Sequence, residues 1–513
     1  MPSNLKWVGH AWKLALLDQP RAEAFTVDLA YLLSLVASDP WSSTTQKLRH
    51  PLSLRFNHSQ RLTSNAQRAM NGPPLPPKHG NWVTRNLRFQ LFPAFRRIVS
   101  VILLINLIGL VLVLCKPNID GVASDQLATW ASSNFLVAIF VRQDFFINTL
   151  YRSAWMVPWS VPLCVRRVVA RIYVYGGLHS GTAMAGTMWF IFLTVVSTIR
   201  FARDRSYAPA AVIVTWVILT LLLVILILAS GPLRFRFHNS FEITHRFLGW
   251  SSILLFWAQL LLLTQHTHQT SNTPFATLLI HQPTLWILTL TTALIIHPWL
   301  YLSRWTFTPH KLSSHAMRLH FTNPVHRFSC LALSTNPLRE WHPFATFPST
   351  DPAEPGTSLI VSAAGDWTRA LINCPSPRTT YWVKGFPKAG VLSLTCIFRR
   401  VVIVTTGSGI GPSMASLLER PAGQFIRLVW SARAPRATYG KELVKLVERQ
   451  DPGAVVMDSS REGRLNLREV AYQVQKEVEA EAVFVLSNKE VTKWLVYGLE
   501  SRGVKVYGPI FDS

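Results

Sequence analysis

The chain has 513 residues and carries 51 lysines and arginines against 26 acidic residues, which gives a formal net charge of +25. Charged residues make up only 15% of the chain and hydrophobic residues 49%. This composition excludes a globally disordered chain, and it is too poor in charge for an ordinary soluble domain, about a quarter of which is charged. It favours a protein with a membrane-resident part.

The first 95 residues are predicted to be a cytoplasmic, partly disordered region. Lys6, Lys13 and Asp18 interrupt the apolar residues at the start, so no clean signal peptide is expected. Residues 38–95 are rich in Ser, Asn, Pro and Arg, a composition typical of a linker. The five cysteines are scattered and form no CxxC pair, so neither a zinc ribbon nor a disulfide framework is predicted.

Six apolar segments between residues 96 and 305 predict a polytopic α-helical membrane bundle. Each is long enough to cross a hydrocarbon core of about 30 Å. The segments lie at 98–115, 130–151, 172–199, 208–229, 241–264 and 283–303. Arg142 and Asp144 interrupt the second segment, where they are expected to pair with each other inside the bundle. An interfacial position of this segment is the alternative.

Positive charge in the loops predicts the orientation of the bundle. Arginines gather in the loops near 152–171 and 231–240, whereas the loop at 265–282 has no lysine or arginine. By the positive-inside rule both termini are cytoplasmic, although three arginines near 200–207 do not follow the rule. The cations are spread along the chain and no nucleic-acid-binding module accompanies them. A lipid bilayer, of the plasma membrane or an endomembrane, is therefore the predicted partner, and nucleic acid is not.

Two histidines near the inner ends of predicted spans are candidate metal ligands. His179 and His245 lie at comparable depth in two spans that run in the same direction. Two imidazoles that face each other across a bundle can ligate a haem iron axially. Gly176, Gly177 and Gly181 are expected to leave room for the flat macrocycle. The alternative is that the histidines only hydrogen-bond neighbouring helices.

Strand-like segments replace the apolar helices after residue 305. Stretches such as HRFSCLALS and TSLIVSAAG predict a small β-barrel over residues 306–398. Residues 399–513 begin with an apolar strand, a glycine-rich turn and a helix, and they continue with further strands and helices, which predicts an α/β nucleotide-binding domain. Glycine lets the backbone approach a pyrophosphate, and the helix N-terminus adds favourable partial charge. A glycine turn without a ligand is the alternative.

The order of a multi-span bundle, an HPF-bearing barrel and a TGSGIGP unit resembles the ferric reductase/NADPH oxidase superfamily. Within it, the chain is most similar to a fungal branch of integral membrane flavoproteins linked to conidiation, whose transmembrane regions also occur fused to adenylation enzymes. The resemblance covers residues 96–513. It is carried by YGGLHSG, FHNSFEITHRFLGW, REWHPFATF, AAGDWTR, FRRVVIVTTGSGIGP and YGLESRGVKVYGPIFDS. It implies a cytoplasmic, ferredoxin-reductase-like tail with an FAD-binding barrel and an NAD(P)-binding α/β domain.

The resemblance also implies where the flavin binds. His342, Pro343 and Phe344 match the stretch in which a strand end receives FAD. The family then usually has a serine or threonine whose hydroxyl reaches the flavin. Here that position is Ala345, with Thr346 one residue later.

The pyridine-nucleotide site is implied in the same way. Arg433 follows a strand end where the family often holds an adenosine phosphate, although a solvated surface charge is the alternative. The positions that match the loop for the pyridine nucleotide are Gly407, Ser408, Gly409, Ile410, Gly411 and Pro412.

Two departures from the family pattern limit the prediction. The reductases place a second histidine about fourteen residues, or about four helical turns, after the first on both haem-bearing spans. Those positions here are Leu193 and Gln259, so at most one inner haem b is predicted, ligated by His179 and His245. The family's Cys-Gly-Pro stretch near the nicotinamide is Leu486-Ser487-Asn488, which lacks the sulfur and weakens the prediction of hydride transfer.

These features predict a membrane flavoprotein that passes electrons from NAD(P)H through FAD to an inner haem or a small acceptor, in fungal development or secondary metabolism. A non-catalytic membrane regulator or sensor that retains flavin or nucleotide binding is the alternative. A third interpretation is a transporter-like bundle with a structural tail, for which the Arg142–Asp144 pair would be the support. The sequence identifies no catalytic residue, electron acceptor or protein partner, and it does not distinguish NADH from NADPH.

Overall fold

The computed structural model describes residues 74–115, 124–204, 207–271, 273–373 and 377–510. The chain divides into two units, residues 1–60 and residues 61–513. The first unit lies outside the described residues, as does most of the predicted N-terminal region at 1–95.

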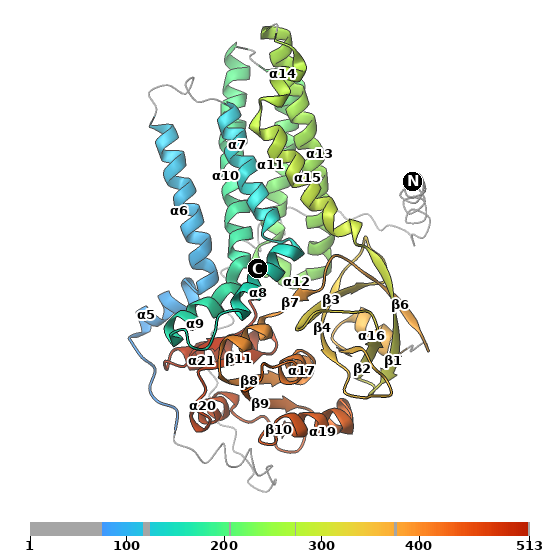
Figure 1. Ribbon diagram of the computed structural model, residues 1–513. Coiled ribbons are helices and arrows are strands. Elements are labelled where there is room, and N and C mark those ends of the chain that lie inside the picture. Colours follow the sequence, from blue (N-terminus) through green and yellow to red (C-terminus); the bar gives the residue numbers. More distant parts are fainter. Residues whose placement is uncertain (1–73, 116–123, 205–206, 272, 374–376, 511–513) are drawn as a thin grey trace. The chain divides into compact units, whose positions relative to one another are not determined.

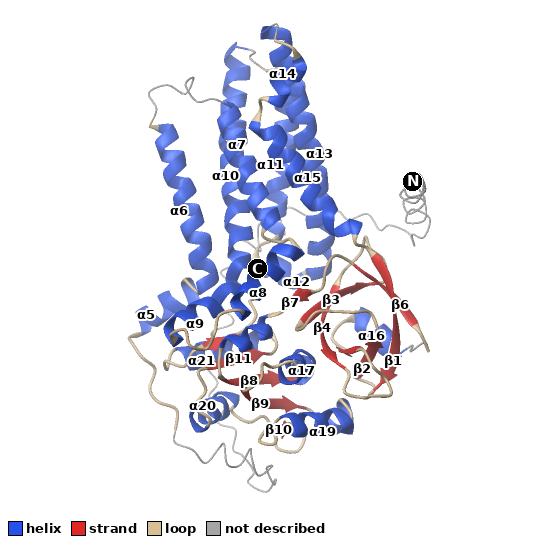
Figure 2. Cartoon of the chain, in the orientation of Figure 1, coloured by secondary structure: helices blue, strands red, loops and turns tan. Residues whose placement is uncertain are grey.

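Long apolar helices form a bundle; most of the shorter helices lie at its tail-facing end, and α14 lies at the opposite end (Figures 1 and 2). The long helices are α6 (Ala94–Leu114), α7 (Ser124–Phe140), α10 (Gly176–Asp204), α11 (Pro209–Leu228), α13 (His238–Ser271) and α15 (Pro283–Leu300). The shorter ones are α5 (Trp82–Arg85), η1 (Asn86–Leu91), α8 (Asp144–Trp155), α9 (Leu163–Val169), η3 (Ala170–Tyr175), α12 (Gly231–Arg236) and α14 (Phe275–Ile280).

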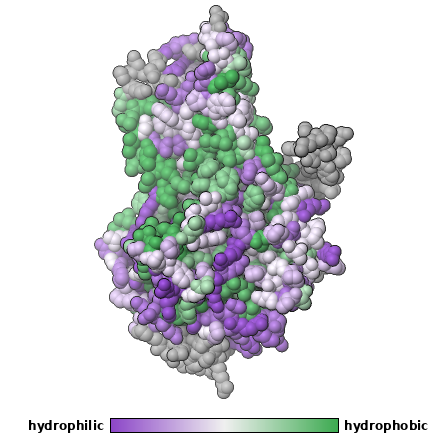
Figure 3. Space-filling model, viewed as in Figure 1, coloured by the Kyte–Doolittle hydropathy of each residue, from purple (hydrophilic) through white to green (hydrophobic). Residues whose placement is uncertain are grey.

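Five helical segments of the described chain are long and apolar enough to cross a membrane, judged by length and composition. Large apolar side chains such as Leu104, Leu112, Ile213 and Leu254 are exposed on these helices. In the space-filling view, hydrophobic residues cover much of the bundle, while the tail is largely hydrophilic (Figure 3). Contiguous apolar surface of this kind marks an interaction with a membrane or another protein.

The predicted span at 130–151 is wrong in its bounds. Helix α7 ends at Phe140, and α8 begins at Asp144 after a short break, so no single helix covers the segment. The predicted Arg142–Asp144 pair is also wrong. Asp144 instead pairs with Lys388, 3.0 Å away, and accepts a hydrogen bond from the backbone N–H of Phe386. The acidic side chain therefore fastens the tail to the bundle, and the transporter-like interpretation loses its support.

Seven strands after the bundle form an antiparallel sheet in the order β4-β5-β2-β1-β6-β3-β7. A further pairing between β3 and β4 closes the first six strands into a barrel, as predicted. The strands are β1 (Ser303–Lys311), β2 (Ala316–Phe321), β3 (Ser329–Ser334), β4 (His342–Pro348), β5 (Thr357–Ser362), β6 (Thr379–Val383) and β7 (Lys388–Ala389). Helix α16 (Asp366–Asn373) follows β5, and η4 (Val391–Ile397) leads out of the barrel.

The last part of the chain forms a five-stranded parallel sheet in the order β10-β9-β8-β11-β12. Its central strand β8 is an almost continuous buried apolar run, which is typical of a parallel strand covered on both faces. The strands are β8 (Arg400–Thr406), β9 (Phe425–Ala432), β10 (Val455–Asp458), β11 (Ala482–Leu486) and β12 (Val506–Tyr507). The helices are η5 (Gly407–Gly409), α17 (Ile410–Leu418), α18 (Pro435–Thr438), α19 (Lys441–Gln450), α20 (Leu467–Glu477) and α21 (Lys489–Glu500).

The tail and the short helices α8 to η3 share one hydrophobic core. Tyr151 of α8 and Ala170 of η3 are buried in the same cluster as Phe398 and Tyr507 of the tail. Three of the four arginines of the 152–171 segment, from which the orientation was predicted, contribute polar contacts to the same interface, namely Arg166, Arg167 and Arg171. Arg166 binds both carboxylate oxygens of Glu481 at 2.9 Å, so the helical base and the parallel sheet are joined directly.

Candidate functional site

The strand β4 brings His342 to the edge of the barrel beside helix α16. The His342 ring stacks on Trp367, with the ring centroids 4.4 Å apart and the planes inclined by 25°. Its Nε2 atom is buried and has no hydrogen-bond partner among the described residues. Burial lowers the pKa of His342 below its ordinary value, although Glu340 and Glu242 oppose this, so the ring is neutral near pH 7. An unsatisfied, neutral ring nitrogen is free to contact a bound cofactor.

The neighbouring residues on β4 alternate between the two faces of the strand. Pro343 is exposed, and Phe344 faces Trp367 at 6.0 Å between ring centroids. Thr346 is buried, and its hydroxyl donates to the carbonyl oxygen of Ser329. Thr346 therefore belongs to the barrel core and does not replace the hydroxyl that Ala345 lacks.

The glycine-rich loop joins the carboxyl end of β8 to α17. Gly407 has a φ of +51°, in the left-handed region that favours glycine. A Cβ atom on Gly409 would lie 2.1 Å from Thr405 Oγ1 and 2.8 Å from the carbonyl oxygen of Leu486, so no side chain fits there. Ser408 is exposed between these two glycines. The sequence folds into a tight loop because both positions require glycine, for different reasons.

The loop lies where parallel sheets of this kind bind ligands. The chain runs from β8 outward to β9 and β10, and it then returns to add β11 on the other side of β8. Ligands bind outside the carboxyl ends of the strands at such a switch point. The Thr405 hydroxyl donates to Leu486 at the end of β11, and Thr406 hydrogen-bonds Ser487, so the two strand ends are braced together.

Helix α17 also connects the loop to the barrel. It packs against β4, and Gly411 lies close to Ile360 of β5 (Figure 1). Ile410 and Gly411 are buried, while Pro412 is partly exposed at the first turn of the helix. The structure therefore places the glycine loop and β4, the predicted flavin-binding strand, on adjoining elements.

Arg433 lies directly after β9, at the same edge of the sheet as the glycine loop. Its side chain is exposed and forms no ion pair with a described residue. Its backbone carbonyl accepts a hydrogen bond from Thr438 Oγ1, which fixes the turn that follows. This position is compatible with an adenosine phosphate and with a solvated charge.

His179 and His245 lie close together inside the bundle, as their comparable depth predicted. Their ring centroids are 6.3 Å apart and their planes are inclined by 40°. A metal ion bound about 2 Å from one nitrogen of each ring separates the centroids by roughly 6 Å. His179 Nδ1 donates to the carbonyl oxygen of Ala138, which leaves Nε2 for a ligand in the arrangement that orients metal-binding imidazoles. The two side chains thus fit one haem iron.

The predicted role is wrong for Gly177 and Gly181, two of the three glycines beside His179. Cβ atoms on Gly177 and Gly181 would lie 2.9 Å from Phe95 O and from Ile102 Cδ1, both on α6. These glycines let α6 and α10 approach each other closely, and they do not border the space between the two histidines. No group of three or more histidine, cysteine or acidic side chains able to hold a metal ion occurs in the described chain.

The sequence analysis did not predict a link between the histidine pair and β4, the predicted flavin-binding strand. Arg246, next to His245, pairs with Glu242 at 2.7 Å and donates to the carbonyl oxygens of Leu338 and Arg339, just before β4. Both residues stand in the motif FHNSFEITHRFLGW, so the acidic–basic pair one helical turn apart was a visible signal. The contacts that Arg246 makes with the barrel were not visible in the sequence.

Lys384 is a second residue that no sequence pattern pointed to. Its ammonium group lies over the rings of Trp299 and Trp341, 4.7 and 4.8 Å from their centroids. Burial, followed by the charges of Arg246 and Lys388, lowers its pKa to about 8. A lysine whose pKa is lowered to about 8 therefore lies where the bundle meets the barrel.

The described architecture defines a class: a helical bundle joined to an antiparallel barrel and a parallel α/β sheet with a glycine loop at its switch point.

The sequence is similar to a family model and to curated proteins. Residues 391–513 match the family model described as the C-terminal domain of adenylate-forming reductase 03009. Adenylate-forming reductase 06235 of Coprinopsis cinerea is 38% identical over 441 residues, which cover 86% of this chain and 42% of that protein.

Adenylate-forming reductase 03009 of the same fungus is 37% identical over 441 residues, covering 85% of this chain and 42% of that protein. The chain thus spans about two fifths of the length of the curated relatives it matches. This relationship agrees with the predicted reductase. It does not test the assignment to the ferric reductase/NADPH oxidase superfamily or its conidiation-linked branch, which stays a prediction.

Solved structures show only weak likeness. A ferredoxin NADP+ reductase from Neisseria gonorrhoeae with bound FAD and NADP is 16% identical and covers 41% of this chain and 99% of its own, with a TM-score of 0.32. A flavohemoglobin from Malassezia yamatoensis with bound FAD and heme is 14% identical and covers 75% of this chain and 98% of its own, with a TM-score of 0.35. At such TM-scores these likenesses do not establish a shared fold.

Proposed function

We propose that the chain is the electron-transfer part of a membrane-bound flavoprotein reductase. In this proposal NAD(P)H binds at the glycine loop, FAD binds along β4, and electrons leave through one haem b held by His179 and His245 or through a small acceptor. A bound flavin supplies the chemistry that accepts a hydride from a nicotinamide and releases electrons singly. The bundle lies in a lipid bilayer with the tail on the cytoplasmic side, as the arginine-rich base favours.

The observation that supports this proposal most strongly is the chain of direct contacts between the three candidate sites. The glycine loop continues into α17, and α17 packs on β4. The segment before β4 is held by Arg246, the neighbour of His245. Each candidate site is therefore fixed relative to the next, as sequential electron transfer needs.

The side chains have separate roles in this proposal. The backbone N–H groups at the start of α17 bind the pyrophosphate of the nucleotide. His342 presents a neutral ring nitrogen to the flavin, and Trp367 holds the orientation of that ring. His179 keeps its Nδ1 proton on Ala138 and offers Nε2 to the iron.

A regulator or sensor is the second candidate, and specific contacts favour it. Asn488 caps α21 through its side chain, and Ser487 hydrogen-bonds Thr406. The side chains of the segment that replaces the family's Cys-Gly-Pro are therefore engaged in contacts that stabilise the fold. Ala345 offers the flavin no hydroxyl. In that case flavin and nucleotide would bind without rapid hydride transfer.

The decisive experiment is an absorbance spectrum of the full chain in detergent, followed by anaerobic addition of NADPH. A reductase gives a flavin spectrum that bleaches, and a sensor gives a flavin spectrum that does not. A colourless protein that cannot be loaded with FAD contradicts both.

Replacing Ser408 by aspartate is expected to weaken NADPH binding about tenfold, because it places a negative charge at the helix N-terminus that should receive the pyrophosphate. Ser408 is exposed, so the fold should tolerate the change. Gly409→Val is less informative, since its side chain would clash with Thr405 whether or not a ligand binds. The measurement is the NADPH concentration dependence of flavin bleaching, with Ser408→Ala as the matched control. Equal dependence in the two variants would remove the loop from nucleotide binding.

Replacing His342 by phenylalanine is expected to lower the flavin retained per protein about threefold to tenfold. The change keeps the stack on Trp367 and removes only the unpartnered ring nitrogen, which amounts to one lost hydrogen bond. The readout is the ratio of flavin to protein absorbance after gel filtration. His310→Phe on β1 is the control, because His310 pairs with Glu354. Flavin content that falls equally in both variants would speak against a contact at His342 Nε2.

A further inference from the structure

A cavity of about 1220 Å³ lies in the half of the bundle away from the tail. It is lined by residues of α7, α10, α13, α14 and α15. Leu193 and Gln259, which stand where a second haem would need histidines, are among them. The space is larger than a typical small-molecule pocket and far larger than a packing defect.

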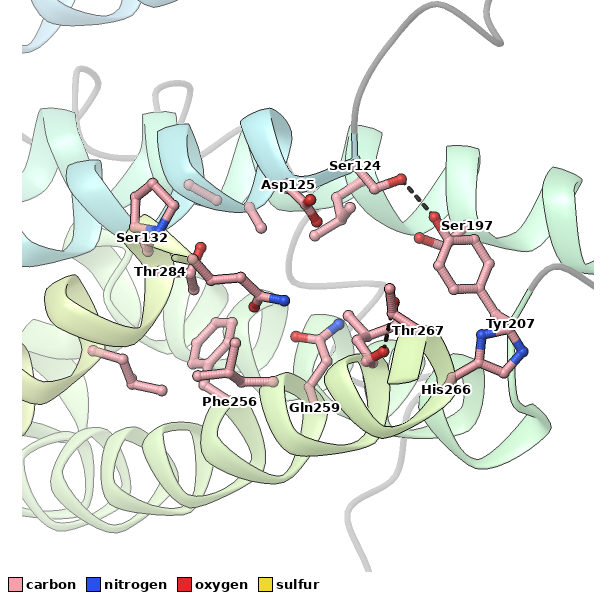
Figure 4. Close-up of a pocket in the computed structure, with 18 of the residues that line it drawn as sticks. Ser124, Asp125, Ser132, Ser197, Tyr207, Phe256, Gln259, His266, Thr267 and Thr284 are labelled. Atoms are coloured by element: carbon pink, nitrogen blue, oxygen red, sulfur yellow. Dashed lines mark hydrogen bonds between the residues drawn. The ribbon is translucent and has the colours of Figure 1, made fainter. Parts of the chain in front are cut away.

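The lining changes character along the helix axes. Toward the middle of the bundle it is aromatic and aliphatic, with Phe135, Phe190 and Phe256. Toward the far end it carries many hydroxyl groups and several charges. In the close-up, Ser124 and Asp125 lie on one side of the space, and Phe256 and Gln259 on the opposite side (Figure 4). An occupant therefore needs an apolar body and a polar end.

The cations of the lining already have partners. Arg200 donates to Ser124 Oγ at 2.8 Å, and Ser124 in turn hydrogen-bonds the Tyr207 hydroxyl (Figure 4). Arg203 pairs with Asp204 at 2.8 Å. The lining holds Asp125 and Asp204 beside Arg200 and Arg203, so its formal charges balance, which favours a neutral occupant over an anionic one.

Several of the remaining polar groups of the lining offer hydrogen-bond acceptors. The hydroxyls of Thr267 and Thr270 donate to backbone carbonyls of their own helix, which leaves their oxygen lone pairs for a ligand. His281 Nδ1 donates to the carbonyl oxygen of Thr277, so its Nε2 is an acceptor in the neutral ring.

Gln259 adds an acceptor deeper in the cavity. It is 6% exposed, and its amide nitrogen donates to Thr215 Oγ1 at 2.5 Å. No described residue donates to its amide oxygen. A buried acceptor of this kind gains from a donor on the occupant.

We propose that this cavity binds a neutral hydroxylated aromatic molecule. The phenylalanine side chains take up its ring system, and its hydroxyl groups donate to the acceptors on α13 and α14. This binding site is independent of the proposed redox function, because none of its residues belongs to the flavin, nucleotide or histidine sites.

The test uses 2-naphthol as the probe and the full chain in detergent, without added flavin or nucleotide. Titration followed by naphthol fluorescence is expected to saturate at one site per chain. The matched ligand 2-methoxynaphthalene has the same ring system but no donor, and it should bind about threefold to tenfold more weakly.

Two threonine variants separate the cavity from the rest of the bundle. Thr267→Val removes a lining acceptor with little change of shape and should weaken 2-naphthol binding about threefold to tenfold. Thr289→Val on α15 is the control, because Thr289 donates to its own helix in the same way but does not line the cavity. Gln259→Leu should have at least the effect of Thr267→Val. The proposal is overturned if binding does not saturate, if both ligands bind equally, or if the two valine variants behave alike.

Discussion

Replacing His245 by alanine is expected to abolish the haem absorbance band of the purified protein, and His179→Ala should do the same. Each change removes one of the two imidazoles whose rings stand 6.3 Å apart, and a six-coordinate haem needs both. The measurement is the Soret band of detergent-extracted protein after expression with a haem supply. The loss should be complete, which makes this the largest spectroscopic effect expected of any single substitution.

The control for the histidine experiment is His297→Phe. His297 also lies near the tail-facing end of the bundle, but its ring packs against Phe145, Tyr301 and Phe386. Phenylalanine preserves that packing, so the Soret band should be unchanged. A wild-type chain without a Soret band would reduce the proposal to flavin and nucleotide alone. A band that survives both alanine substitutions would place the haem elsewhere.

Replacing Arg166 by methionine is expected to lower the free energy of unfolding by about 2 to 3 kcal/mol. The guanidinium group is buried between the helical base and the tail, and its loss leaves the Glu481 carboxylate without its charged partner. The measurement is the shift of the urea midpoint of the full chain. Arg436→Met is the matched control, because the Arg436–Glu448 pair is exposed and should contribute less than about 1 kcal/mol.

The same ion pair predicts a dependence on pH. Burial raises the pKa of Glu481, but hydrogen bonds from Arg166 and from the backbone of Arg399 outweigh it, so the net pKa lies below the ordinary value of 4.5. The stabilisation is therefore complete above about pH 4.5 and is lost as the pH falls through the lowered value. Arg166→Met should remove this part of the acid sensitivity. An unchanged acid profile would show that Glu481 does not contribute to docking.

The elements of the fold follow largely from local patterns. Long apolar runs predicted the helical bundle, and alternating apolar and polar residues predicted the barrel strands. The order of strand β8, glycine loop and helix α17 predicted the α/β domain. The closeness of His179 and His245 followed from their depth in parallel spans, and their role as ligands stays a prediction. The helices and strands could be predicted because each depends on residues that are close in the chain.

Other features depended on contacts between distant segments. Asp144 pairs with Lys388, and Gly177 allows α6 to pack closely against α10. Neither role was visible in the neighbouring sequence. The break after α7 likewise reflects the use of α8 as a docking helix. By contrast, the position of Thr346 could have been foreseen, because successive residues of a strand face opposite sides.

The shared core of α8, η3 and the tail bears on how this molecule can be divided or recombined. Tyr151 and Ala170 complete the same apolar cluster as Phe398 and Tyr507. A gene fusion or truncation that cuts after α15 would leave that cluster open on one side and expose it to water. A recombinant tail is therefore expected to stay soluble only if the helical base, α8 to η3, is carried along with it.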